Sequence, residues 1–107
     1  MKSATKKEFE WTRFLRFYGE QNHGRPTRLG IFENGHDFWI EDGLPLSGID
    51  FDAVNGQLTI QIMLGDAMTH TIPDVRAARV FFSTSEMNDG LDISDSAGKT
   101  TVLRFEN

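Results

Sequence analysis

The sequence contains no cysteine, and this absence excludes disulfide bonds, thiolate metal sites and cysteine nucleophiles together. It also lacks any apolar run close to the roughly 18 residues that a membrane-spanning helix needs. The N-terminal stretch MKSATKKEFEW has no apolar core of the roughly 7–15 residues found in secretory signals. Together these absences predict a cytoplasmic protein that does not associate with membranes.

Basic residues are the minority charge. Eleven Lys and Arg residues stand against sixteen Asp and Glu residues, which gives a formal net charge of −5. A protein whose main task is to hold phosphate backbones usually carries the opposite sign. The charge balance therefore argues against nucleic acid as the partner.

Length and composition indicate one domain, residues 1–107. A chain of this size buries about two-thirds of its unfolded surface, which is enough for a core without covalent staples. The hydrophobic fraction is 38%, with nine Phe and two Trp, which is too rich in aromatics for a disordered chain. We expect a helix over about residues 5–23 and a β-rich body over about residues 28–106.

The first segment has the pattern of an amphipathic helix. Thr5 and Glu8 have the spacing of a capping box, in which each side chain satisfies a free backbone N–H. Apolar residues then recur at helical spacing and predict one buried stripe: Trp11, Phe14, Leu15 and Tyr18. Gly24, with Pro26 just beyond it, is typical of a helix end.

Two Asn-Gly pairs, at 34–35 and 55–56, predict two-residue hairpin turns, since this pair suits the positive φ angles of a type I′ turn. A turn at 55–56 matches apolar residues across the strands: Ala53 with Leu58, Phe51 with Ile60, and Ile49 with Ile62. The opposite face then carries polar residues, as a one-sided sheet requires: Asp50, Asp52, Gln57, Thr59 and Gln61.

The hairpin at 34–35 gives a second set of pairs: Ile31 with Phe38, Leu29 with Ile40, and Gly30 with Trp39. Gly30 would leave space for the indole. Because Phe32 shares the face of Trp39, we expect this hairpin to be covered on both sides, with the helix as the candidate cover.

A third hairpin, with the three-residue loop 96–98, pairs Leu91 with Leu103 and Ile93 with Thr101. Residues 79–84 predict another strand, and residues 44–48 an extended connector. The sequence thus predicts an α+β fold with one N-terminal helix followed by about seven short antiparallel strands. The strands are expected to form a curved sheet or small barrel capped by the helix.

Five motifs occur in a fixed order: EWTRFL at 10–15, HG at 23–24, LPLSGI at 44–49, THTI at 69–72 and LDISDSAGKTTVLRF at 91–105. Together they resemble a family of small bacterial proteins known only as a domain of unknown function. The resemblance covers about residues 6–106. It implies a compact cytoplasmic bacterial domain, and it carries no catalytic or binding residue over to this chain.

His70 is the best candidate for chemistry, with Asp66 and Asp74 as nearby carboxylates. Its orientation depends on the length of the preceding turn. A three-residue turn, 65–67, places His70 opposite Ile62 and points it inward, whereas a two-residue turn places it opposite Gln61 on the polar side. We expect the first arrangement, with His70 largely buried, neutral, held by one hydrogen bond and lowered in pKa.

Other chemistry has weak support in the sequence. The histidines, His23, His36 and His70, lack the spacing of a metal motif, and residues 88–98 lack the order of a calcium loop. The chain has neither a nucleophile elbow nor a phosphate-binding glycine loop. We therefore expect no metal and no cofactor, and the balance leans away from an enzyme.

The charge is unevenly distributed. Residues 1–28 carry a net charge of +4, and residues 29–107 carry −9. This polarity fits a basic helix resting on an acidic sheet, or a contact face for an acidic partner, made by Arg13, Arg16, Arg25 and Arg28.

The function that we predict is a non-enzymatic protein-binding module of the inhibitor or immunity type. Its partner is expected to be another protein or a second copy of the chain. The alternatives are a small ligand-binding protein or enzyme using His70 with its nearby carboxylates, and a weak nucleic-acid module using the basic helix.

Overall fold

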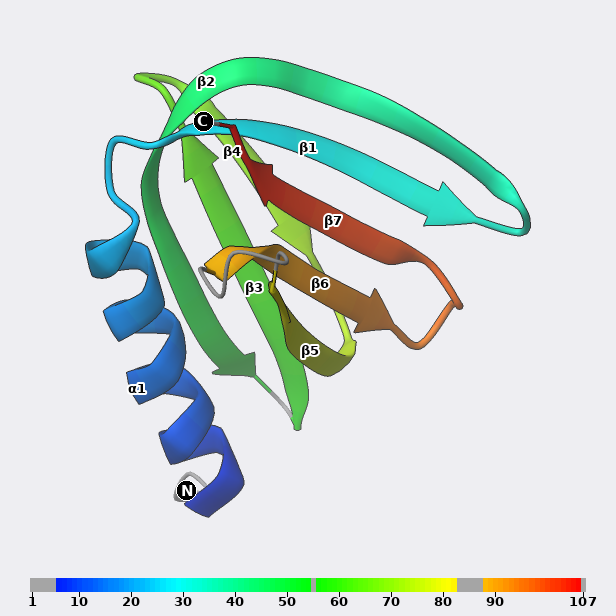
Figure 1. Ribbon diagram of the computed structural model, residues 1–107. Helices are drawn as coiled ribbons and strands as arrows, with labels where there is room; N and C mark the ends of the chain where they lie inside the picture. Colours follow the sequence, from blue (N-terminus) through cyan, green and yellow to red (C-terminus); the bar gives the residue numbers. More distant parts are fainter. Residues whose placement is uncertain (1–5, 55, 83–87, 107) are drawn as a thin grey trace.

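The computed structural model describes residues 6–54, 56–82 and 88–106 (Figure 1). One helix precedes seven antiparallel strands in this part of the chain, which confirms the predicted α+β class. The elements are α1 (Lys6–Gln21), β1 (Pro26–Glu33), β2 (His36–Val54), β3 (Gln57–Leu64), β4 (Met68–Ile72), β5 (Val75–Phe82), β6 (Asn88–Asp95) and β7 (Thr100–Phe105).

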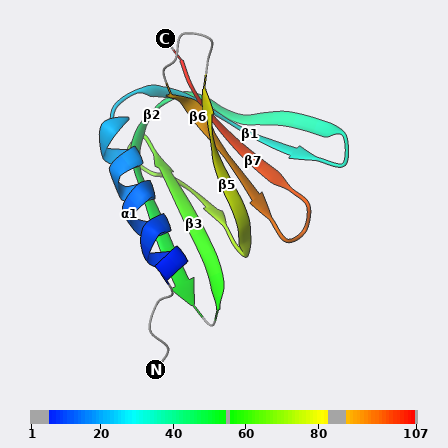
Figure 2. The ribbon, with the colours of Figure 1, turned by 60° about the horizontal axis from the view of Figure 1, so that its bottom comes forward.

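The strands form one sheet in the order β4-β3-β2-β1-β7-β6-β5. It curls strongly into a half-barrel (Figures 1 and 2), because strands twist and the bulges at several pairings increase that twist. The curl brings β3 into contact with β5. The two edge strands, β4 and β5, follow each other in sequence, yet the described residues form no ladder between them.

β2 is longer than the sequence predicts. Residues 44–48, which we expected to form a connector, belong to a single 19-residue strand. The first half of β2 pairs with β1 and the second half with β3, and the exchange of partners occurs at this stretch. Gly43, with φ at +99°, allows the backbone to turn there, and the hydroxyl of Thr27 donates to the carbonyl of Leu44 at 2.8 Å. The strand of the 34–35 hairpin and the strand of the 55–56 hairpin, which we expected to be separated by a connector, are therefore one bent strand.

Most predicted registers are confirmed. The apolar pairs of β2 with β3 and of β6 with β7 are those given by the turn lengths, and the three-residue turn at 65–67 places His70 opposite Ile62. One pair is wrong. Leu29 lies opposite Glu41 and not Ile40, because a bulge between Leu29 and Gly30 adds one residue on β2.

α1 packs against β2 and closes the core (Figure 2). Leu15 and Tyr18 are buried as predicted, but Phe14 is 40% exposed. The helix approaches β2 through Gly19, where an added Cβ would lie 3.2 Å from the backbone N of Ile49. This close contact turns Phe14 away from the core, so the predicted stripe is wrong at that position.

The helix ends earlier than expected. It stops at Gln21, and Gly24 turns the chain with a φ of +84°. Thr5, the side chains of Glu8 and Trp11, and residues 83–84 of the expected strand 79–84 lie outside the described part. The capping box and the burial of Trp11 therefore stay predictions. Within the described residues, no helix has the length and apolar character needed to cross a bilayer.

Candidate functional site

His70 lies on the inner face of β4, beside the fully buried Ile62 of β3, and it is half-buried where we expected it to be largely buried. Burial lowers the pKa of its imidazole, and the positive charge of Lys99 lowers it further. Its Nε2 atom is buried and makes no hydrogen bond to the described residues. The expected hydrogen-bond partner is therefore missing at this nitrogen. The imidazole is neutral at neutral pH.

The structure does not bring the predicted carboxylates to His70. Asp74 accepts a hydrogen bond from the hydroxyl of Ser96, and its carboxylate lies 3.8 Å from the guanidinium of Arg76. Asp66 is exposed in the turn between β3 and β4. The charge that acts on the imidazole is the cation Lys99, which is the wrong sign for a carboxylate–histidine base. Among the described residues, no cluster of three or more His, Asp or Glu side chains could hold a metal ion.

The four arginines predicted to bind a partner divide into two pairs. Arg13 and Arg16 lie on the exposed side of α1. Arg25 donates to the Asn22 side chain at 2.9 Å, and its Cζ lies 4.4 Å from the centroid of the Phe105 ring.

Arg28 lies over the indole ring of Trp39 and close to the carboxylates of Asp42 and Glu106. The second pair therefore has structural partners within the chain.

A small groove lies between α1 and β2. Its volume is about 140 Å³, which is less than half of the roughly 300 Å³ at which ligand pockets begin. Its charged lining is mixed in sign, since it includes Arg16 together with Glu20 and Asp50. The groove is too small for a ligand of ordinary size, and its lining favours neither a cationic nor an anionic ligand.

The feature that sequence reasoning missed is the outer half of the β1–β2 hairpin. This segment, residues 30–40, is called the arm here. Its tip projects from the curled sheet (Figures 1 and 2), while residues 30–32 still pair with β7. The arm leaves three large aromatic side chains partly exposed. Phe32, Phe38 and Trp39 are 38%, 52% and 40% exposed. The expectation that this hairpin would be covered on both sides, with the helix as the candidate cover, is wrong at the arm, since α1 packs on β2 beyond it.

The two faces of the arm follow from its register. Phe32 pairs with Asp37, and Gly30 with Trp39, so these four residues share one face. Gly30 allows the indole to lie across β1, as predicted, because a Cβ at this position would be 2.7 Å from Cε3 of Trp39. Phe32 meets the indole edge-on, with 6.2 Å between the ring centroids. Phe38 occupies the other face.

Arg28 lies on the same face of the hairpin as Phe32 and Trp39, next to the indole ring. Its Cζ lies 4.1 Å from the centroid of the indole ring. Its Nε lies 3.5 Å from an oxygen of Asp42 and 4.0 Å from one of Glu106. The hydrogen bond between these two carboxyl groups, burial and the charge of Asp42 raise the pKa of Glu106, and Arg28 opposes the rise. One guanidinium thus joins an aromatic face to an acidic pair.

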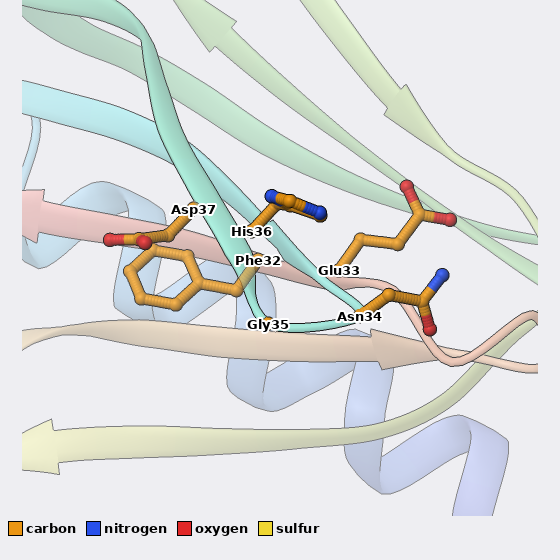
Figure 3. A pocket seen from close by; sticks show the side chains of 6 residues that line it. All are labelled: Phe32, Glu33, Asn34, Gly35, His36 and Asp37. Atoms are coloured by element: carbon orange, nitrogen blue, oxygen red, sulfur yellow. The ribbon is translucent and has the colours of Figure 1, made fainter.

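A hollow of about 370 Å³ lies at the tip of the arm (Figure 3), around the turn that Asn34 and Gly35 make with φ angles of +51° and +80°. Figure 3 shows the ring of Phe32 beside the carboxylate of Asp37. The residues that line the hollow are Phe32, Glu33, Asn34, Gly35, His36 and Asp37. The Phe32 ring thus lies with the carboxylate of Asp37 on one face of the tip, while Glu33, which pairs with His36, points to the other face.

Comparisons with family models, with curated proteins and with solved structures found no match for this chain. The resemblance to a family of small bacterial proteins rests on the ordered sequence motifs and stays a prediction. Function is therefore inferred from the surface of the chain itself.

Proposed function

We propose that this chain is a non-enzymatic protein-binding module, of the inhibitor or immunity type, that contacts its partner through the arm. The observation that carries the proposal is the exposure of Phe32, Phe38 and Trp39 together on one projecting hairpin. Aromatic residues are enriched at protein interfaces and in their energetic hot spots. Phe14 and Phe17 of α1 are exposed as well, at 40% and 60%, so the gathering of three aromatic side chains on one hairpin, and not exposure alone, distinguishes the arm.

The arm is also rigid enough to bind without a large loss of entropy. A two-residue turn closes it, Gly30 seats the indole of Trp39, and Arg28 stacks on that ring. Side chains that are already ordered before binding lose little freedom on complex formation, which raises affinity. These contacts support a binding surface formed before the partner arrives. The lack of cysteine fits such a module in a reducing cytoplasm.

The alternatives have less support in the geometry. An enzyme using His70 would need a carboxylate or a water-filled cleft beside the imidazole, whereas its cross-strand partner is the buried Ile62 and the charge that acts on it is that of Lys99. A nucleic-acid module would need basic residues around its exposed aromatics. Arg28 does lie over Trp39, but Asp42 and Glu106 already neutralise its charge, and the arm itself carries carboxylates at Glu33 and Asp37.

Site-specific photo-crosslinking tests the proposal. A benzophenone amino acid replaces Phe38, and a matched control replaces Gln61, an exposed polar residue of β3. In lysate of the native cells, position 38 should give a discrete adduct that position 61 does not give. The captured protein is identified by mass spectrometry and purified, and its affinity for the chain is measured.

With the purified partner, Phe38→Ser should weaken binding by about 30-fold or more, as for a hot-spot residue, while Gln61→Ala should not. Equal labelling from the two positions, or unchanged affinity of Phe38→Ser, would contradict the proposal.

A further inference from the structure

The hollow at the tip of the arm is lined by acidic residues without a lysine or arginine among its described lining. These acids are Glu33 and Asp37. Along the chain, residues 29–75 contain no lysine or arginine, although Lys99 directly precedes Thr100, the β7 partner of Phe32. The acids in that stretch are Glu33, Asp37, Glu41, Asp42, Asp50, Asp52, Asp66 and Asp74.

Next to the inner end of the arm, the chain itself provides a contact between a guanidinium, an aromatic ring and a carboxylate. There the Cζ atom of Arg28 lies 4.1 Å from the ring centroid of Trp39, and its Nε lies 3.5 Å from an oxygen of Asp42. The outer end repeats the acceptor half of that arrangement, because Phe32 and Asp37 are directly paired across the hairpin. It has the aromatic ring and the carboxylate, and it lacks the cation.

We propose that the tip of the arm docks on a basic surface of the partner protein and receives an arginine side chain between Phe32 and Asp37. Guanidinium is favoured over ammonium because its planar group stacks on a ring while it donates in its plane to a carboxylate. The proposal rests on the proposed function of the arm and adds the chemistry of the partner.

Charge complementarity decides between the possible occupants. A basic protein surface is attracted by the acids of the arm and of β2, which also speeds encounter. A nucleic acid would bring phosphates, which Glu33 and Asp37 would repel. A second copy of the chain carries a net charge of −5, and only its N-terminal segment, residues 1–28 with +4, could meet these acids, so a separate basic protein is favoured.

NMR titration tests the arginine site with defined peptides. The probes are a short peptide of alternating arginine and serine, a lysine–serine peptide of equal charge, and a glutamate–serine peptide. The arginine peptide should shift the Trp39 indole N–H and the backbone amides of residues 32–37. The lysine peptide should bind there more weakly, and the glutamate peptide should leave these signals unmoved. Shifts centred on Asp50 and Asp52 would overturn the proposal.

Two single-charge variants sharpen the test. Asp37→Asn removes the carboxylate beside Phe32, and Asp52→Asn removes one exposed carboxylate elsewhere on β2. Asp37→Asn should weaken the arginine peptide by about fivefold, whereas Asp52→Asn should change it by less than about twofold. Phe32→Leu, which removes the ring but keeps an apolar side chain, should weaken it by about two- to fivefold. Equal effects of the two charge variants would contradict the proposal.

The partner captured at position 38 separates this proposal from the function on which it rests. A partner that binds the arm through a neutral or acidic surface would overturn the arginine site and leave the module function standing. Localised arginine-peptide binding without any specific adduct at position 38 would support the site and count against the module function.

Discussion

The guanidinium of Arg28 lies over the indole ring of Trp39, with 4.1 Å between its Cζ atom and the ring centroid. The same guanidinium is 3.5 Å from a carboxylate oxygen of Asp42. One cation therefore fixes an exposed tryptophan and links β1 to β2. The contact depends on the missing side chain of Gly30, because the indole occupies the space that a Cβ would need.

Gly30→Ala should displace the indole of Trp39 and destabilise the protein by about 1–3 kcal/mol, since the new methyl meets ring atoms at 2.7 Å. Urea unfolding measures the loss, and the indole N–H signal of Trp39 reports the displacement. Gly48→Ala is the control, because its nearest contact is the flexible end of Met63 at 3.1 Å. A shift of the indole signal in both variants would contradict this account.

Arg28→Met should reduce stability by about 0.5–1 kcal/mol, because the aliphatic chain keeps its packing but loses the cation–aromatic contact. The midpoint of urea unfolding measures this change. Arg76→Met provides the comparison. Arg76 is exposed, and its ion pair with Asp74 spans 3.8 Å, so little change is expected. Equal losses in the two variants would show that the stacking on Trp39 contributes nothing.

His70→Leu should stabilise the protein by about 1 kcal/mol at neutral pH, because a buried nitrogen without a hydrogen bond is replaced by an apolar group. Thr71→Val, on the exposed face of the same strand, should change stability by less than about 0.5 kcal/mol. Thermal or urea unfolding of both variants measures the difference. A loss of stability in His70→Leu would mean that the imidazole has a partner that compensates its burial.

The pKa of His70 also predicts a pH dependence. Because burial and Lys99 lower the pKa in the folded state, the unfolded state binds a proton more readily. The wild-type protein should therefore lose stability as the pH falls through 6.5, the ordinary value for histidine, toward the lower folded-state pKa. The His70→Leu variant should lack this component. Parallel stability profiles for the two proteins would refute the prediction.

Glu106→Gln should stabilise the protein at neutral pH and have little effect in acid. The pKa of Glu106 is raised, first by its hydrogen bond with Asp42, so the folded state favours the protonated carboxyl. A raised pKa contributes stability below the ordinary value of 4.5 and loses it as the pH rises through the folded-state pKa. Urea midpoints at several pH values test this, and a variant less stable than wild type at neutral pH would contradict it.

The orientation of α1 gives a further prediction. Leu15→Ala should cost about 2–5 kcal/mol, because the side chain is fully buried, whereas Phe14→Ala should cost clearly less, because that ring is 40% exposed. Chemical denaturation of the two variants compares them directly. Equal losses of stability in the two variants would mean that Phe14 is part of the buried stripe, as the helical spacing predicts.

The sequence determined the features that depend on local geometry. Asn34-Gly35 fixed a two-residue turn, Gly98 a three-residue one, and period-two alternation then fixed which residues face each other. The same reasoning placed His70 opposite Ile62, because a register one residue away would have exposed Ile72. Turn length and alternation act over a few residues, so they can be read without knowledge of the rest of the fold.

The tertiary structure decided what depends on how distant elements meet. The curl of the sheet left the arm beyond the reach of α1, so its aromatics became a surface and not a core. The close approach of Gly19 to Ile49 set the rotation of the helix, and the exchange of partners along β2 made one strand of two. The fold also brought Lys99 close enough to act on His70, and no rule of sequence spacing predicts this because the two residues are far apart in the chain. Burial and charge at a site are sums over all neighbours in space, and only the folded chain fixes those neighbours.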